Sequence, residues 1–149
     1  FDVSADFTNG AVLDVVSGTH YLGQFTVASG NIDVSAVDNS LSSAEIGFKF
    51  DVTLISNPID TMSQTGPLTG EPRSMNKVIL DLSNTLSVSV NSNNLIIRQV
   101  TDDLSLARQA VTGKKEFRLL GFSKDPQVTI SQSAPLSLQV NSVIAEVTF

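Results

Sequence analysis

The runs Lys77-Val78-Ile79-Leu80-Asp81-Leu82 and Val143-Ile144-Ala145-Glu146-Val147-Thr148-Phe149 decide the fold class of this chain. Both are short, rich in β-branched residues and bounded by Ser, Asn or Gly, a pattern typical of β-strands. Similar runs follow one another from Gly66 to Phe149 without a helix-length gap. This part of the chain therefore predicts a continuous ladder of paired strands.

The first half of the chain shows the same punctuation. Ile46, Phe48, Phe50, Val52 and Leu54 alternate with small or polar residues, which predicts one amphipathic strand with Phe48 and Phe50 pointing into the core. The turn signals Ser29-Gly30-Asn31 and Asn91-Ser92-Asn93-Asn94 each predict a tight reversal between strands. Further strands are predicted at 11–16, 21–27, 32–37, 86–90, 95–100, 115–120, 128–132 and 136–140.

The number and spacing of these strands predict an all-β fold, an antiparallel sandwich or a barrel-like structure. Residues 101–112 fit either one helical turn or a loop. The segment from Asn57 to Pro72 holds most of the chain's prolines and is the best candidate for a boundary. We expect two small lobes, an N-terminal β lobe at 1–57 and a C-terminal β-sandwich lobe at 58–149; one continuous domain is the alternative.

Composition restricts the kinds of function. The 149 residues include no Cys and no Trp, which excludes disulfides, thiolate chemistry and Trp platforms for sugars or bases. Residues 1–72 carry nine acidic residues and one basic residue, a formal charge of −8, whereas residues 73–149 carry +2. This acidic balance argues against a surface that grips nucleic acid, and the asymmetry is compatible with contacts between unlike faces of neighbouring molecules as well as with simple scatter.

Two features of the chain bear on its processing and location. No run approaches the roughly 20 apolar residues of a membrane-spanning helix, so we expect no membrane insertion by this segment. The chain begins at Phe1, and Val12–Val16 is too short and too acidic for a signal peptide. We therefore expect the sequence to be a fragment of a longer protein.

Five features of the sequence are candidates for sites of chemistry. His20 is the only histidine, beside a turn and without an evident nucleophile. Asp102-Asp103 lacks the spaced oxygen ligands of a calcium loop, and Gly66–Gly70 and Gly113-Lys114-Lys115 lack the pattern of a phosphate-binding loop. The acidic residues show no pair placed like glycosidase carboxylates. The sequence therefore predicts no catalytic, cofactor-binding or metal-binding residue, and no enzyme.

Several segments, taken in order, carry a family resemblance. Glu45–Phe50 looks like the strand that enters this region in the family, and the strongest similarity lies in the later strands and turns. These are 66–73, 77–85, 112–116, 125–132, 134–138 and 143–147. Together they resemble the C-terminal region of the tail nozzle protein (tail tubular protein B) of short-tailed bacteriophages. Ser83 departs from the pattern, because the family often has an aromatic residue there.

The resemblance implies a structural protein of the virion without an active site or cofactor. Members of the family are similar in forming homo-hexameric rings below the portal and adaptor, in contact with tail fibres. The ring is part of the tail tube through which DNA is ejected, so DNA would pass the lumen without specific binding. An acidic wall suits such a passage, because it does not hold phosphates.

Two other classes of function stay open at the level of sequence. A carbohydrate-binding or adhesion β-sandwich would need an exposed aromatic shelf, for which Tyr21 and spare Phe residues are the candidates. A β-fold hydrolase would need paired carboxylates in a cleft or a polar network around His20.

Overall fold

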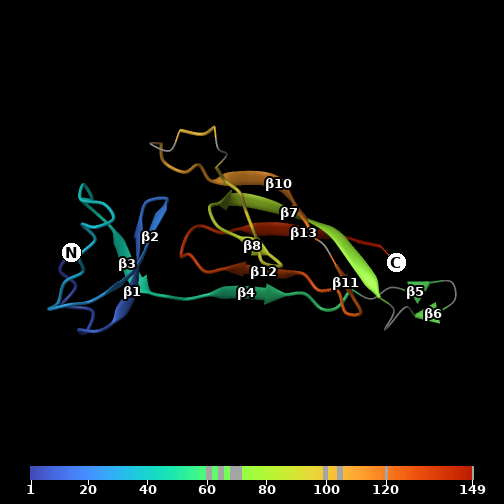
Figure 1. Cartoon of the computed structure of the whole chain (residues 1–149), viewed down its shortest axis with the longest axis horizontal. Coiled ribbons are helices and arrows are strands. Elements are labelled where there is room, and N and C mark those ends of the chain that lie inside the picture. The colour runs from blue at the N-terminus through green and yellow to red at the C-terminus, as the bar shows by residue number, and fades with distance from the viewer. Residues whose placement is uncertain are drawn as a thin grey trace.

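The computed structural model describes residues 1–59, 62–63, 66–67, 72–98, 101–103, 106–119 and 121–148. The fold is all-β, with antiparallel sheets that do not close into a barrel, as the sequence predicted. No helix long and apolar enough to cross a membrane occurs among these residues. Figure 1 shows a small N-terminal sheet at one end of the chain and a larger sandwich beside it.

The N-terminal lobe has one sheet in the order β2-β1-β3. Its strands are β1 (Val12–Ser17), β2 (His20–Thr26) and β3 (Glu45–Phe48). The lobe has its own hydrophobic core, because Leu13 and Val15 of β1 pack against residues of the flanking loops. The buried members of this core are Val3, Leu13, Val15, Val27, Ile32 and Val34.

The C-terminal part contains two larger sheets that face each other. In the first, the long strand β7 (Arg73–Thr85) pairs with β10 (Val111–Arg118), β11 (Phe122–Ser123) and β13 (Val140–Thr148). The second has the order β4-β12-β8-β9. Its strands are β4 (Val52–Ile55), β12 (Thr129–Gln132), β8 (Ser89–Val90) and β9 (Asn93–Asn94). A separate hairpin joins β5 (Met62–Ser63) and β6 (Gly66–Pro67).

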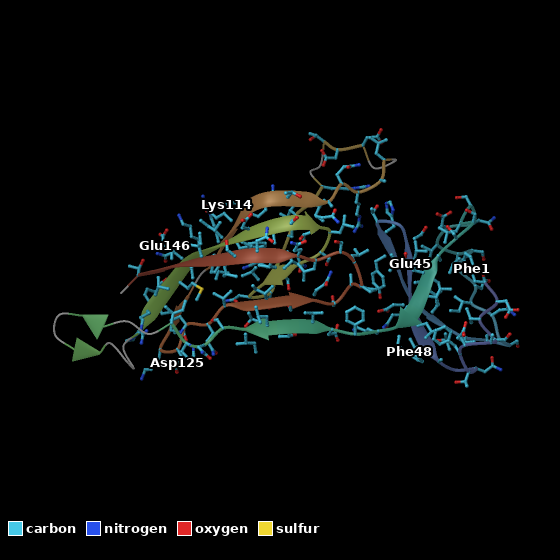
Figure 2. All side chains as sticks on the ribbon, turned by 180° about the vertical axis from the view of Figure 1, so that it is seen from behind. Phe1, Glu45, Phe48, Lys114, Asp125 and Glu146 are labelled. Atoms are coloured by element: carbon cyan, nitrogen blue, oxygen red, sulfur yellow. The ribbon has the colours of Figure 1, made fainter. Side chains whose placement is uncertain are left out.

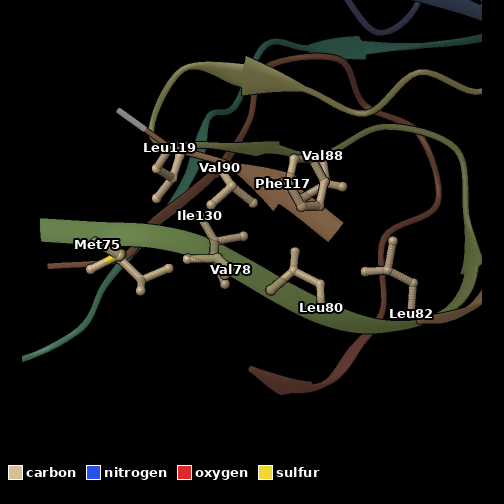
Figure 3. Packing of buried hydrophobic residues seen from close by; sticks show 10 residues of the cluster. Met75, Val78, Leu80, Leu82, Val88, Val90, Phe117, Leu119 and Ile130 are labelled. Atoms are coloured by element: carbon tan, nitrogen blue, oxygen red, sulfur yellow. The ribbon is translucent and has the colours of Figure 1, made fainter. Parts of the chain in front are cut away.

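One core joins the two larger sheets, which makes this part a sandwich. Alternate residues of β7 point inward, and Val78, Leu80 and Leu82 are fully buried. They meet residues from the opposite sheet and its connections, as Figure 3 shows. The buried cluster comprises Met75, Val78, Leu80, Leu82, Val88, Val90, Phe117, Leu119, Val128 and Ile130.

The single strand predicted over Ile46–Leu54 is wrong. The chain instead forms β3, which pairs with β1, and β4, which pairs with β12 in the other sheet. Residues 49–51 cross between the sheets, so alternation cannot continue through them. Phe48 and Phe50 are consequently exposed rather than in the core. By its pairing β4 belongs to the C-terminal sheet, although it lies before the predicted lobe boundary at residue 57.

Four other predicted strands are wholly or partly irregular, and of 86–90 only Ser89–Val90 forms a strand. Residues 32–34 are irregular and 35–37 form a turn, and the Asp33 carboxylate accepts the Ser35 N–H at 2.9 Å, an alternative to ladder pairing. Their inward side chains Ile32 and Val34 are nevertheless buried. Residues 95–98 and 136–139 are also irregular, and 99–100 lie outside the described residues.

Both predicted tight reversals are present. Ser29 and Gly30 have φ angles of 51° and 76° between the bridged residues Ala28 and Asn31. Asn91 and Ser92 have φ angles of 45° and 69° and connect β8 to β9, the geometry of a two-residue hairpin loop. In residues 101–112, the described positions 106–110 have no helix, and Leu104 lies outside the described residues.

The alternating burial of β7 makes a stability prediction. Leu80→Ala should lower the free energy of unfolding by about 2–5 kcal/mol, because it leaves a cavity in the sandwich core. Ile79→Ala is the matched control, since Ile79 is the next residue of β7 and only half-buried on the opposite face. Urea unfolding measures both variants. Equal losses would contradict the assigned inner face.

Candidate functional site

The residues that the sequence singled out for chemistry are not brought together. His20 opens β2 opposite Ser17 and is half-buried. Asp102 and Asp103 are exposed in the segment that follows the β8–β9 hairpin. Within the described part of the chain no three His, Cys, Asp or Glu side chains gather in a way that could hold a metal ion.

The two glycine-containing segments, Gly66–Gly70 and Gly113-Lys114-Lys115, include residues of strands. Gly66 belongs to the β5–β6 hairpin, and residues 68–71 lie outside the described residues. Gly113 has a φ angle of 107° where the register of β10 against β7 shifts between Val111 and Gly113. A side chain is strained at that angle, so Gly113 serves the bulge.

The one buried carboxylate of the described chain belongs to Asp14, on the face of β1 opposite the N-terminal core. Its Oδ1 accepts a hydrogen bond from the Tyr21 hydroxyl at 2.9 Å, whereas its Oδ2 is buried without a hydrogen-bond partner. Burial, followed by the hydrogen bond to Asp14, raises the pKa of Tyr21 from 10.0 to about 12. Tyr21 also lines a cavity of about 380 Å³ whose other walls come from the sandwich, among them Leu86 and Arg98. The hydrogen bond therefore joins β1 to β2 within the N-terminal sheet.

Tyr21→Phe should lower the free energy of unfolding at neutral pH by about 1–3 kcal/mol, because Asp14 would be left without its donor. The raised pKa means that the folded chain holds the phenol proton more tightly than the unfolded chain does. This contribution is present below pH 10 and is lost as the pH rises through 12. The difference between wild type and Tyr21→Phe should therefore narrow from pH 10 to 12 in chemical unfolding. A constant difference would contradict the assignment.

The most prominent surface feature is an apolar groove between the two sheets of the sandwich. The groove has a volume of about 350 Å³, and we call it the open seam. It runs between β4 and β13, the edge strands of the two sheets, and β12 forms its floor. Its lining contains no charged side chain and consists of Leu54, Ser56, Ile59, Val128, Ile130, Val143 and Ala145.

Inward-facing residues are exposed along the open seam. Leu54 lies opposite the buried Ile130, and Val143 lies opposite the buried Leu80, so both point to the inner side of the sandwich. Leu54 nevertheless keeps 59% of its surface exposed and Val143 keeps 41%. Two sheets normally cover such residues by facing each other. At this side the sandwich is left uncovered.

The backbone of β4 is also unpaired on this side. Ser56 N donates to Val128 O at 2.9 Å, which makes these two residues a hydrogen-bonded pair of the β4–β12 ladder. Bonded and non-bonded pairs alternate in an antiparallel ladder. The N–H and C=O groups of Leu54 therefore face β12, whereas those of Thr53 and Ile55 point out from the sheet edge. These outward groups have no partner among the described residues.

The β10 edge of the same molecule is different. Lys115 lies opposite the buried Leu80, so this edge strand carries a charge on its inner side, and Lys114 and Glu116 flank it. Figure 2 shows Lys114 on this strand. Inward-pointing charges and bulges are features that prevent an edge from pairing with another chain. Within the described strands, β10 has both features, whereas β4 pairs with β12 without a bulge and neither β4 nor β13 carries a charge on its inner side.

Two ion pairs lie on the strands or connections that border the open seam, and neither lines it. Lys49 Nζ and Asp51 Oδ1 are 3.6 Å apart just before β4, and Lys77 Nζ and Glu146 Oε2 are 2.9 Å apart across β7 and β13. The hydrogen bond to Glu146 raises the pKa of Lys77. Each pair is neutral as a unit, so the surroundings of the seam add little net charge.

A second exposed apolar group lies at the N-terminal lobe. Phe48, labelled in Figure 2, contacts Phe7 edge-to-face with ring centroids 5.3 Å apart and remains exposed, as does Phe50. Sequence reasoning missed both this group and the open seam, because alternation alone places such residues in the core. The absence of charge within Val52–Ile55 was the available signal for the seam.

No protein-family model matches the chain, and no curated protein matches its sequence.

Proposed function

We propose that this chain is a structural module of a phage tail, the C-terminal region of a tail nozzle protein. Its role would be to self-associate into a ring, with six copies as the family resemblance implies, and to dock onto the tail adaptor and tail fibre proteins. The proposed location is the virion. The role needs neither a catalytic residue nor a cofactor.

The observation that carries the proposal is the assembly of the resembling segments into one unit with an uncovered apolar side. Segments 77–85, 112–116, 125–132 and 143–147 lie on β7, β10, β12 and β13 or their turns, within one sandwich. That sandwich ends in the open seam, where apolar side chains and backbone groups lack partners. Exposed apolar surface of this kind is typical of a protein that is covered by another.

The charge distribution supports the proposed passage of DNA. Acidic side chains of the N-terminal lobe, including Asp2, Asp6, Asp33 and Glu45, are exposed. For Asp33, hydrogen bonds from the side chain and backbone of Ser35 lower the pKa, so this carboxylate keeps its charge under mildly acidic conditions. A lumen lined by such groups repels phosphates, which would let DNA move without specific binding.

The full-length parent protein should form a ring-sized species, either alone or when its adaptor is added. Light scattering of the parent, of the adaptor and of their mixture measures this mass. The adaptor alone is the control for its own assembly. A parent that stays strictly monomeric both alone and in the mixture with its adaptor would contradict the proposal.

A carbohydrate-binding or adhesion module is the alternative, and the exposed Phe48 and Phe50 are the observation that favours it. Aromatic faces are the usual platforms for sugar rings, although Tyr and Trp also supply a polar group that Phe lacks. Glycan-array binding by the chain, lost in Phe48→Ala, would favour this function over the nozzle.

A further inference from the structure

We propose that the open seam is the docking site for a second copy of this chain, whose extended strand pairs with the free edge of β4 and covers the exposed apolar side chains. The inference rests on the proposed assembly role and names the surface through which two copies would meet. Docking of a second copy requires backbone pairing, apolar contact and compatible charges.

The backbone of β4 offers a template for another strand. The N–H and C=O groups of Thr53 and Ile55 point outward and have no partner among the described residues. An extended segment laid along this edge would satisfy them through the same ladder that β12 forms on the other side. The main-chain hydrogen bonds would fix the direction and register of the added strand.

The side chains beside this edge require an apolar occupant. Leu54 and Val143 point to the inner side of the sandwich but are exposed, and Ala145 of β13 also lines the groove. A strand added at β4 would turn every second side chain toward these residues. Burying them would continue the sandwich core rather than create a new kind of contact.

The charge of the chain favours a second copy as this occupant. Two copies, each with a formal charge of −6, repel each other when their acidic N-terminal lobes meet. The open seam has no charged lining residue, and the neighbouring Lys49–Asp51 and Lys77–Glu146 pairs are neutral. Like-charged copies can therefore approach here without like-charge contact. The lining has no cationic side chain that could bind an anionic partner. A basic partner would bind the acidic N-terminal lobe instead.

The test is the oligomeric state of the 149-residue chain, measured by sedimentation equilibrium over a range of concentrations. The seam variant is Leu54→Glu, which places a charge in the groove. The matched control is Leu106→Glu, because Leu106 is similarly exposed, at 64% against 59%, and lies outside the seam. Thr53→Pro is a second variant, since it removes an outward N–H and keeps the ladder bonds to β12. Circular dichroism confirms that each variant folds.

Wild type and Leu106→Glu should self-associate to the same extent as their concentration rises. Leu54→Glu and Thr53→Pro should each raise the dissociation constant by about tenfold or more. A chain that is monomeric at every concentration would overturn this inference, as would equal effects of Leu54→Glu and Leu106→Glu. Protection of the Thr53 and Ile55 amides only on addition of the adaptor would also overturn it and assign the seam to that protein. If the parent still forms rings in these cases, the proposed function stands without this surface.

Discussion

The pairing of β7 on both of its edges is the constraint on which the sandwich depends. This 13-residue strand pairs with β10 and β11 on one side and with β13 on the other. Because side chains alternate, a register slip by one residue would turn Val78, Leu80 and Leu82 from the core to the opposite face. Extra residues at Asn76 of β7 and Asn141 of β13 produce bulges that limit such slips.

A sheet built around a central strand ends in edge strands. In this molecule the edge strands differ in the charge and the exposure of their inward side chains. The β10 edge carries Lys115 on its inner side and a bulge at Gly113. The side formed by β4 and β13 carries no charge on its inner face, β4 pairs with β12 without a bulge, and Leu54 and Val143 are left uncovered. Since an apolar open edge favours association with another chain, this inequality would direct the proposed assembly to one side of the sandwich. The same fold that stabilises the chain thereby sets how copies could be arranged.

The sequence predicted the all-β class and most strands because alternation and turn residues are local signals. The run 77–82 was predicted as a strand from its composition and its bounding turn residues, and Asn91-Ser92 was recognised by its tolerance of positive φ. The break between β3 and β4 could not be predicted, because residues 46–54 alternate without interruption. Which sheet a segment joins depends on partners far away in the chain, such as β1 and β12.

The candidate surface was less predictable than the fold. Alternation identifies which side of a strand faces inward, but it does not say whether another layer covers that side. Leu54 shows this difference, because it faces inward and remains exposed. The Asp14–Tyr21 hydrogen bond was equally hidden, since the two residues meet only through the register of β1 with β2. Covering layers and cross-strand partners are properties of the assembled structure.

Hydrogen exchange of individual amides, measured by NMR on the monomeric chain, tests the central role of β7 most directly. The amides of Leu80 and Leu82 should exchange only through global unfolding and be among the slowest in the sandwich, because both edges of β7 are paired. The amides of Thr53 and Ile55 should exchange fast, because they point out from an open edge. Fast exchange along β7, or slow exchange at Thr53 and Ile55 in the monomer, would contradict the account.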